Sequence, residues 1–117
     1  MSKNQGKKEL IQLLNHKKKN PRRFMLFPTI GNRQEKREFR ILDYLICKQH
    51  DNPHKYFVIE QIQPSWKREK ELRFGYYILG KQKGARNKWV WGQFAPLIPL
   101  RDLNVLLRKA GQKGFIK

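Results

Sequence analysis

The sequence predicts an α+β protein: an antiparallel four-stranded meander at about residues 38–95, packed against a C-terminal amphipathic helix at about residues 99–110. Apolar and polar residues alternate in four stretches separated by short turns, and short connections favour antiparallel pairing of consecutive strands. After Pro99, leucines recur at steps of three and four residues, as in a helix with one apolar face. The chain has 117 residues, which fits one domain at about residues 38–117 behind a basic N-terminal extension at about residues 1–37.

The extension begins with a short helix at residues 7–16. This helix is predicted because four apolar side chains fall on one side of it, namely Leu10, Ile11, Leu13 and Leu14. Lys17 to Lys19 are followed by Asn20, Pro21 and two arginines, and such a like-charged run predicts a mobile arm or loop. Residues 24–27 are apolar but end at Pro28, which fits a short strand or a tethered loop.

Four segments then have the pattern of strands. The first covers residues 38–48, is rich in β-branched and aromatic residues, and ends at a turn over residues 49–53. Further turn residues separate the other three, at residues 56–63, 72–81 and 88–95. The connections between these segments are short, so a meander is expected.

The C-terminal helix has the clearest pattern. Pro99 suits a first helical turn, Gly111 marks a stop, and the apolar stripe between them consists of Leu100, Leu103, Leu106, Leu107 and Ala110. A helix with one apolar face after four strands must bury that face against the sheet. The other sheet face is then open, or covered only by the N-terminal segment.

This order of four meandering strands and a helix resembles the repeating unit of the PC4, Whirly and Pur-type folds, which bind single-stranded nucleic acids. The resemblance covers residues 38–111, is one of element order, and carries no site residue over to this chain. If the helix at residues 7–16 is counted and the last two predicted strands are merged, the order of elements instead resembles a double-stranded-RNA-binding domain. The C-terminal helix, however, begins Pro-Leu-Arg-Asp-Leu, without the Lys-Lys-x-Ala pattern of that family.

Charge indicates the class of partner. Lysine and arginine number 27 against 9 aspartates and glutamates, giving a net charge of +18 and an isoelectric point near 10.5. Such a surface attracts polyanions, and nucleic acid is the obvious one. We therefore expect a small, non-catalytic nucleic-acid-binding protein of low sequence specificity, with single-stranded DNA or RNA as the favoured ligand.

Two predicted strands place an aromatic ring between cations on one face. The third has Arg73, Tyr77 and Lys81, and the first has the same arrangement of Arg40, Tyr44 and Lys48. Unpaired bases stack on such rings while the cations hold phosphates. The alternative is that these are ordinary solvated sheet faces.

Basic loops extend this candidate interface. Trp66 lies in a basic loop without apolar neighbours, where it either meets a partner or caps the core, whereas Trp89 and Trp91 are expected in the core. The predicted nucleic-acid-binding residues are Lys17, Lys18, Lys19, Arg22, Arg23, Arg40, Tyr44, Lys48, Trp66, Lys67, Arg68, Arg73, Tyr77, Lys81, Lys83, Arg86 and Lys88.

Two other functions compete with this one. A metal-dependent nuclease would use Asp43 and Glu60, but Ile62 stands where the lysine of a restriction-type site is expected. An RNA-contacting assembly or interaction module would meet RNA only within a larger particle. A catalytic site is therefore not predicted.

Cys47, His50 and His54 have residue types that bind zinc, at a spacing that resembles half of a metal site. A second pair of ligands is missing, and Asp51-Asn52-Pro53 already explains the segment as a turn. We expect neither a metal nor another cofactor.

A single cysteine favours a reducing compartment, and neither a membrane-spanning run nor a secretory signal is evident. A cytoplasmic protein without membrane association is expected. The small core and the open edges of a meander are compatible with a homodimer.

Overall fold

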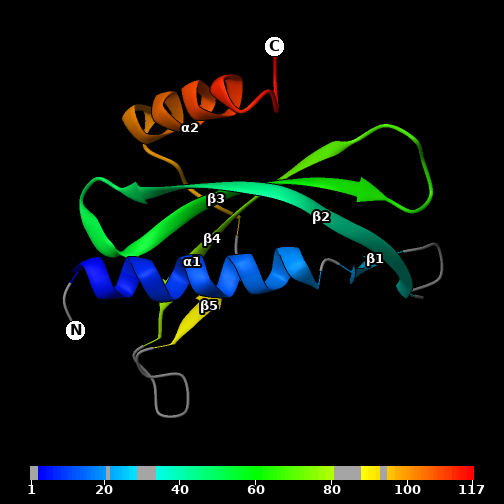
Figure 1. Cartoon of the computed structure of the whole chain (residues 1–117), viewed down its shortest axis with the longest axis horizontal. Helices are drawn as coiled ribbons and strands as arrows, with labels where there is room; N and C mark the ends of the chain where they lie inside the picture. The colour runs from blue at the N-terminus through cyan, green and yellow to red at the C-terminus, as the bar shows by residue number, and fades with distance from the viewer. Residues whose placement is uncertain (1–2, 21, 29–33, 81–87, 93–94) are drawn as a thin grey trace.

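The computed structural model describes residues 3–20, 22–28, 34–80, 88–92 and 95–117. Within them, α1 (Lys3–Lys19) precedes a sheet of β1 (Arg22–Pro28), β2 (Gln34–Gln49), β3 (Asn52–Pro64), β4 (Glu71–Leu79) and β5 (Trp89–Trp91), and α2 (Leu100–Gln112) follows it (Figure 1). Each strand pairs antiparallel with the next, in the order β1-β2-β3-β4-β5. The α+β meander is confirmed, with one more strand than predicted.

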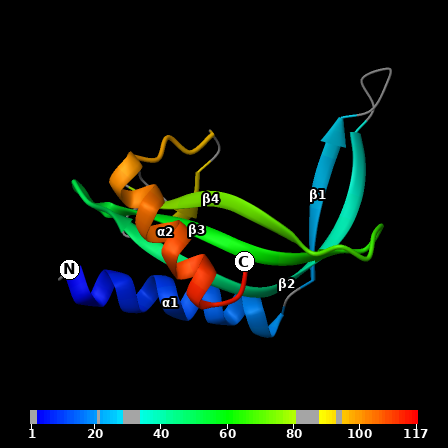
Figure 2. The same ribbon diagram turned by 90° about the horizontal axis from the view of Figure 1, so that it is seen from above.

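The additional strand is β1, which pairs with only the first part of β2. Their register runs from Arg22 opposite Arg40 to Pro28 opposite Gln34, so in the described residues the later part of β2 has a free edge on this side. An irregularity in the β2–β3 register between Ile41 and Asp43 marks this point, and such bulges bend a strand. β1 and the start of β2 project away from both helices (Figure 2).

α1 covers one face of the sheet. Leu10 and Leu14 are buried there, and they pack with Tyr56, Val58 and Tyr77 of β3 and β4. Trp89 adds a hydrogen bond from its indole N–H to the Gly6 carbonyl, at 2.8 Å. The N-terminal segment is thus part of the core. The sequence left open whether the sheet face opposite the C-terminal helix is exposed or covered by this segment, and the structure shows that α1 covers it.

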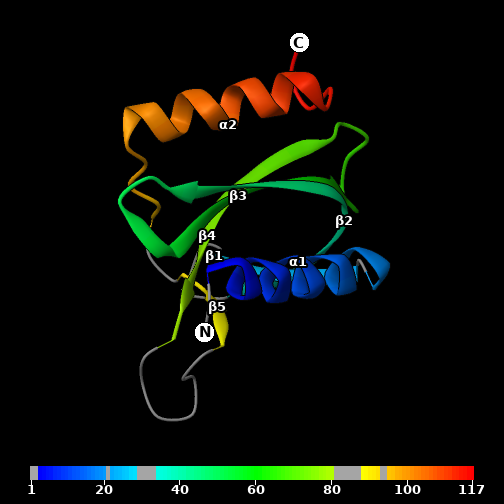
Figure 3. The same cartoon turned by 60° about the vertical axis from the view of Figure 1, so that its left-hand side comes forward.

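α2 lies on the opposite side of the sheet from α1 (Figure 3). Its buried residues Leu106 and Ala110 belong to a core cluster with alternating residues of β2, β3 and β4, namely Leu45, Cys47, Phe57, Ile59 and Tyr76. β3 is therefore buried on both faces, and residues 56–60 are buried without interruption. A smaller cluster of Phe39, Ile41 and Ile62 extends the core toward β1.

A buried carboxylate fixes the first turn of α2. Asp102 is 3% exposed, and its Oδ2 accepts hydrogen bonds from the His50 backbone N–H at 3.2 Å and pairs with His50 Nδ1 at 3.0 Å. These contacts join α2 to the turn between β2 and β3. A carboxylate near a helix N-terminus also interacts favourably with the helix dipole.

Replacing Asp102 with Ala is expected to lower the free energy of unfolding by about 2 kcal/mol, because the His50 backbone N–H and imidazole lose their hydrogen bonds to the buried carboxylate. Urea unfolding measures the change. Asp51→Ala is the control, since Asp51 lies beside His50 but is exposed, and it should change stability by less than about 0.5 kcal/mol. Equal losses in the two variants would mean that Asp102 does not anchor α2.

Candidate nucleic-acid interface

Basic side chains occur on both helices and on β1 to β4. Their distribution alone therefore does not single out one face as a binding surface. The interface has to be identified from exposed rings and from cations that are not committed to buried carboxylates.

The predicted platform of Arg73 and Tyr77 lies beneath α1. Tyr77 is 1% exposed, so its ring is not available for stacking, contrary to the prediction. Arg73 pairs with the buried Glu60 at 2.9 Å and lies over the Trp91 ring at 4.1 Å from its centroid. Both side chains stabilise the core under α1, so neither belongs to the candidate interface.

Lys17 joins this buried cluster by donating a hydrogen bond to the Tyr77 hydroxyl. Burial lowers the pKa of Lys17, with Arg23 and Arg73 adding to the effect and Glu60 opposing it. Burial also raises the pKa of Tyr77. Lys17 is thus directed at the Tyr77 hydroxyl under α1 and not toward a surface where it could hold phosphates.

Lys18 and Tyr44 lie between α1 and the free edge of β2. Lys18 pairs with Asp43 at 3.1 Å, and the Tyr44 hydroxyl donates a hydrogen bond to Asn15 at 2.7 Å. Lys48 is half-buried further along the same strand. These residues do not form a stacking platform, because the Tyr44 ring is turned toward α1.

The turn after β3 carries the predicted Trp66, Lys67 and Arg68, all exposed. Trp66 is 37% exposed and has the Arg37 guanidinium over its ring at 5.4 Å. Lys67 pairs with Glu71 at 2.9 Å. Lys19 and Lys88 are exposed, Arg23 is half-buried, and the predicted residues Lys81, Lys83 and Arg86 lie outside the described residues.

A different surface combines exposed rings with cations. α2 covers its sheet face only over the second part of β2, so the same face toward β1 is uncovered (Figure 2). Register and alternation place four exposed side chains of β1 and β2 on it, and they put the exposed Phe74 of β4 on the same face at the margin of the region that α2 covers, in the row of Leu45 and Ile59. We call this the open sheet surface, and it consists of Arg22, Phe24, Lys36, Arg40 and Phe74.

At the β1 end of the open sheet surface, two cations lie over the Phe24 ring. Lys36 Nζ lies 4.4 Å from the ring centroid and the Arg22 guanidinium 5.3 Å from it. Arg22 also pairs with Glu38 at 2.6 Å, so one carboxylate offsets part of the charge. Arg40 lies opposite Arg22 in the β1–β2 register and is exposed, so its charge keeps this end of the surface positive overall.

Phe74 forms the other end of this surface. It is 39% exposed, compared with 47% for Phe24. Phe74 is opposite Ile59 of β3. Phe24 is opposite Glu38 of β2, which is level with residue 65, just after the end of β3. The two rings are therefore offset by about six residues, or roughly 20 Å along the strands. The two rings are therefore far enough apart to stack different bases.

Sequence reasoning identified Arg22 and Arg40 but missed Phe24, Lys36 and Phe74. Phe74 belongs to the apolar face of the third predicted strand, whereas the candidate residues were chosen from its other face, which carries Arg73 and Tyr77. The missed signal is length: a helix of 13 residues spans about 20 Å, whereas a strand of 16 residues spans about 53 Å. The helix is too short to cover the β1 end of that face, where Phe24 and Lys36 lie.

The two carboxylates of the nuclease hypothesis do not meet. Glu60 is opposite Tyr44 in the β2–β3 register, so it lies on the face opposite to that of Asp43. Both are already paired with cations, Glu60 with Arg73 and Asp43 with Lys18 and Lys113. They do not form a joint metal site.

The cysteine and histidine cluster is also separated. Burial raises the pKa of the Cys47 thiol, His50 pairs with Asp102, and His54 is exposed. Among the residues that the structure describes, no group of three metal-ligating side chains is present.

The chain matches no protein-family model, no curated protein and no solved structure. In the described part of the chain, neither helix is long and apolar enough to span a bilayer.

Proposed function

We propose that this protein binds single-stranded nucleic acid at the open sheet surface, with low sequence specificity and without catalysing a reaction. The observation that carries the proposal is the exposure of Phe24 among Arg22, Lys36 and Arg40, together with the exposure of Phe74 on the same sheet face at the margin of α2. An aromatic ring accepts any base, and cations hold the backbone without reading sequence.

The charges of the whole chain support the same ligand. A net charge of +18 attracts a polyanion from solution and raises the rate of encounter. The rings favour unpaired bases over a duplex, because bases inside a duplex are already stacked on each other.

Affinity is expected to depend strongly on salt. If about six phosphates are contacted, the logarithm of the binding constant falls with that of salt concentration at a slope of about −4 on single strands. Filter binding of oligo(dT), oligo(U) and duplex DNA at several salt concentrations measures this slope. Arg40→Gln should make it shallower by about 0.7, whereas Arg101→Gln, an exposed arginine at the start of α2, should not. A flat salt response would reject the proposal.

The rings are tested separately from charge. Phe74→Leu removes the ring but keeps apolar volume, and it should weaken oligo(dT) and oligo(U) binding about tenfold while affecting duplex binding less. Ile78→Ala is the control because Ile78 is exposed on the same strand and face but has no ring. Equal losses on single strands and duplex would exclude base stacking at Phe74.

A further inference from the structure

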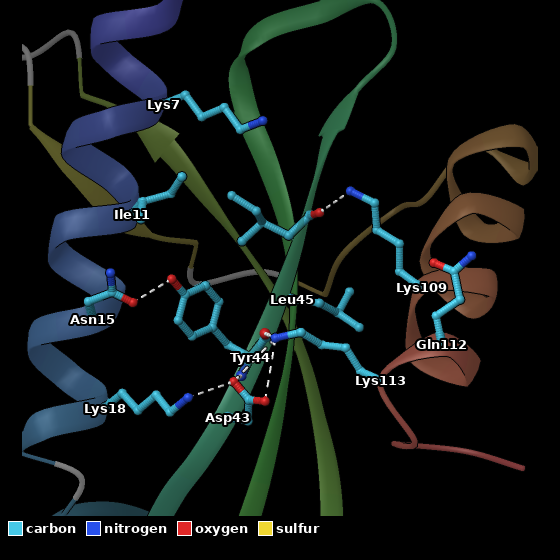
Figure 4. Close-up of a pocket in the computed structure, with 11 residues that line it drawn as sticks. Lys7, Ile11, Asn15, Lys18, Asp43, Tyr44, Leu45, Lys109, Gln112 and Lys113 are labelled. Carbon is cyan, nitrogen blue, oxygen red and sulfur yellow. Dashed lines mark hydrogen bonds and ion pairs between the residues drawn. The ribbon is translucent and has the colours of Figure 1, made fainter.

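A groove lined by lysines runs along the free edge of β2, between α1 and α2 (Figure 4). Its volume is about 470 Å³, within the usual range of small-molecule sites. Lys7 and Lys18 reach it from α1, and Lys109 of α2 and Lys113, the residue that follows α2, reach it from the other side. The groove is separate from the open sheet surface.

The charges in this groove are not balanced. Asp43 is the one carboxylate among the lining residues, and it is shared between Lys18 at 3.1 Å and Lys113 at 3.3 Å. The other two lysines have no ion pair among the described residues. Four ammonium groups and one carboxylate therefore leave the groove with an excess of three positive charges.

Two of the lysines are held by neutral acceptors. Lys113 donates a hydrogen bond to the Tyr44 carbonyl at 2.8 Å, and Lys109 donates one to the Ile46 carbonyl at 2.9 Å. An anion with several oxygens is a stronger acceptor than a backbone carbonyl, because its hydrogen bonds are charge-assisted. A bound anion would therefore replace these carbonyls as the hydrogen-bond acceptor of Lys109 and Lys113.

Asp43 holds two of the lysines at the groove. Burial opposes its ionisation, but the Tyr44 backbone N–H and the ammonium groups of Lys18 and Lys113 outweigh this and hold the pKa of Asp43 below its usual range. It is ionised at neutral pH and connects the two helices around the edge of the sheet. Lys18 and Lys113 are thus already directed into the groove before a ligand enters.

We infer that this groove binds a phosphorylated anion, with Lys7 and Lys109 as donors toward one end of the groove and Lys18 and Lys113 toward the other. The wall of Ile11, Leu45 and Ile46 and the Tyr44 ring leaves apolar room for the organic part of a phosphorylated molecule. A peptide added as a strand fits less well, since it needs the edge carbonyls of residues 44 and 46 that the lysines already occupy.

Calorimetric titration with pyrophosphate tests the site without any base. Saturable binding is expected, and Lys7→Gln and Lys113→Gln should each weaken it about tenfold or more. Lys8→Gln and Lys117→Gln are charge-matched controls, since both lysines are exposed and neither lines the groove. Thermal unfolding of each variant checks that Lys113→Gln remains folded, and Lys7→Gln, which removes no ion pair, tests the site independently. Non-saturable binding, or equal losses in groove and control variants, would overturn the inference.

Two further titrations identify the source of the phosphate. If the natural ligand is a small phosphorylated molecule, a mononucleotide binds with the same dependence on Lys7 and Lys113 as pyrophosphate. If it is the end of a nucleic-acid strand, an oligonucleotide with a 5′-phosphate depends on these lysines and its dephosphorylated form does not. Phe74→Leu should leave pyrophosphate binding unchanged, so failure of the groove and failure of the stacking surface are distinguishable.

Discussion

Replacing Arg73 with Ala is expected to lower the free energy of unfolding by about 3 kcal/mol. The variant leaves the Glu60 carboxylate, which is 1% exposed, without its partner beneath α1. It also removes the cation from the Trp91 ring and from the Phe39 ring, at 4.1 and 5.3 Å from their centroids. Urea unfolding, followed by tryptophan fluorescence and circular dichroism, measures the loss.

Two variants make this test specific. Arg40→Ala removes an exposed arginine and should change stability by less than about 0.5 kcal/mol. Glu60→Gln combined with Arg73→Ala should be less destabilised than the sum of the single variants, because no charge is then left buried. If the two single losses simply add, the ion pair does not account for the effect of Arg73.

Gly75→Ala is the second change with a large expected effect, a loss of about 2 to 3 kcal/mol in the free energy of unfolding. A Cβ atom at this position would lie 2.2 Å from the Trp91 indole. Trp91 packs edge-on against Tyr77, at 5.3 Å between ring centroids, so it cannot move without disturbing the core under α1. Thermal unfolding and the tryptophan emission spectrum report the change.

Gly111→Ala is the matched control for Gly75→Ala. An added Cβ atom at Gly111 meets nothing within 4 Å, and the residue lies in α2. Alanine is favoured over glycine in a helix, so a gain of about 0.5 to 1 kcal/mol is expected. A destabilised Gly111 variant together with an unaffected Gly75 variant would contradict the described packing.

The strands and the C-terminal helix could be predicted because their apolar periodicity reflects burial directly. β1 was harder, since its partner begins with Gln34, Glu35, Lys36 and Arg37, which carry no apolar signal for a strand. α1 extends beyond the predicted residue 16 because Lys17 places its apolar stem against the sheet and its ammonium group on Tyr77.

The error about Tyr77 has a physical cause. Alternation assigns residues to two faces but does not say which face a helix covers. The uninterrupted run Tyr56-Phe57-Val58-Ile59 carries this information, because a strand buried on both faces loses its polar alternation. The groove could not be predicted from the sequence, because its lysines come from opposite ends of the chain and only long-range packing brings them together.

Photo-cross-linking of the intact protein to bromodeoxyuridine-substituted single-stranded DNA, followed by mass spectrometry of the peptides, tests the proposed interface most directly. A base stacked on a ring reacts with that ring. Cross-links are expected at Phe24 and Phe74, and they should disappear from position 74 in Phe74→Leu. Cross-links confined to other residues, or none at low salt, would contradict binding at the open sheet surface.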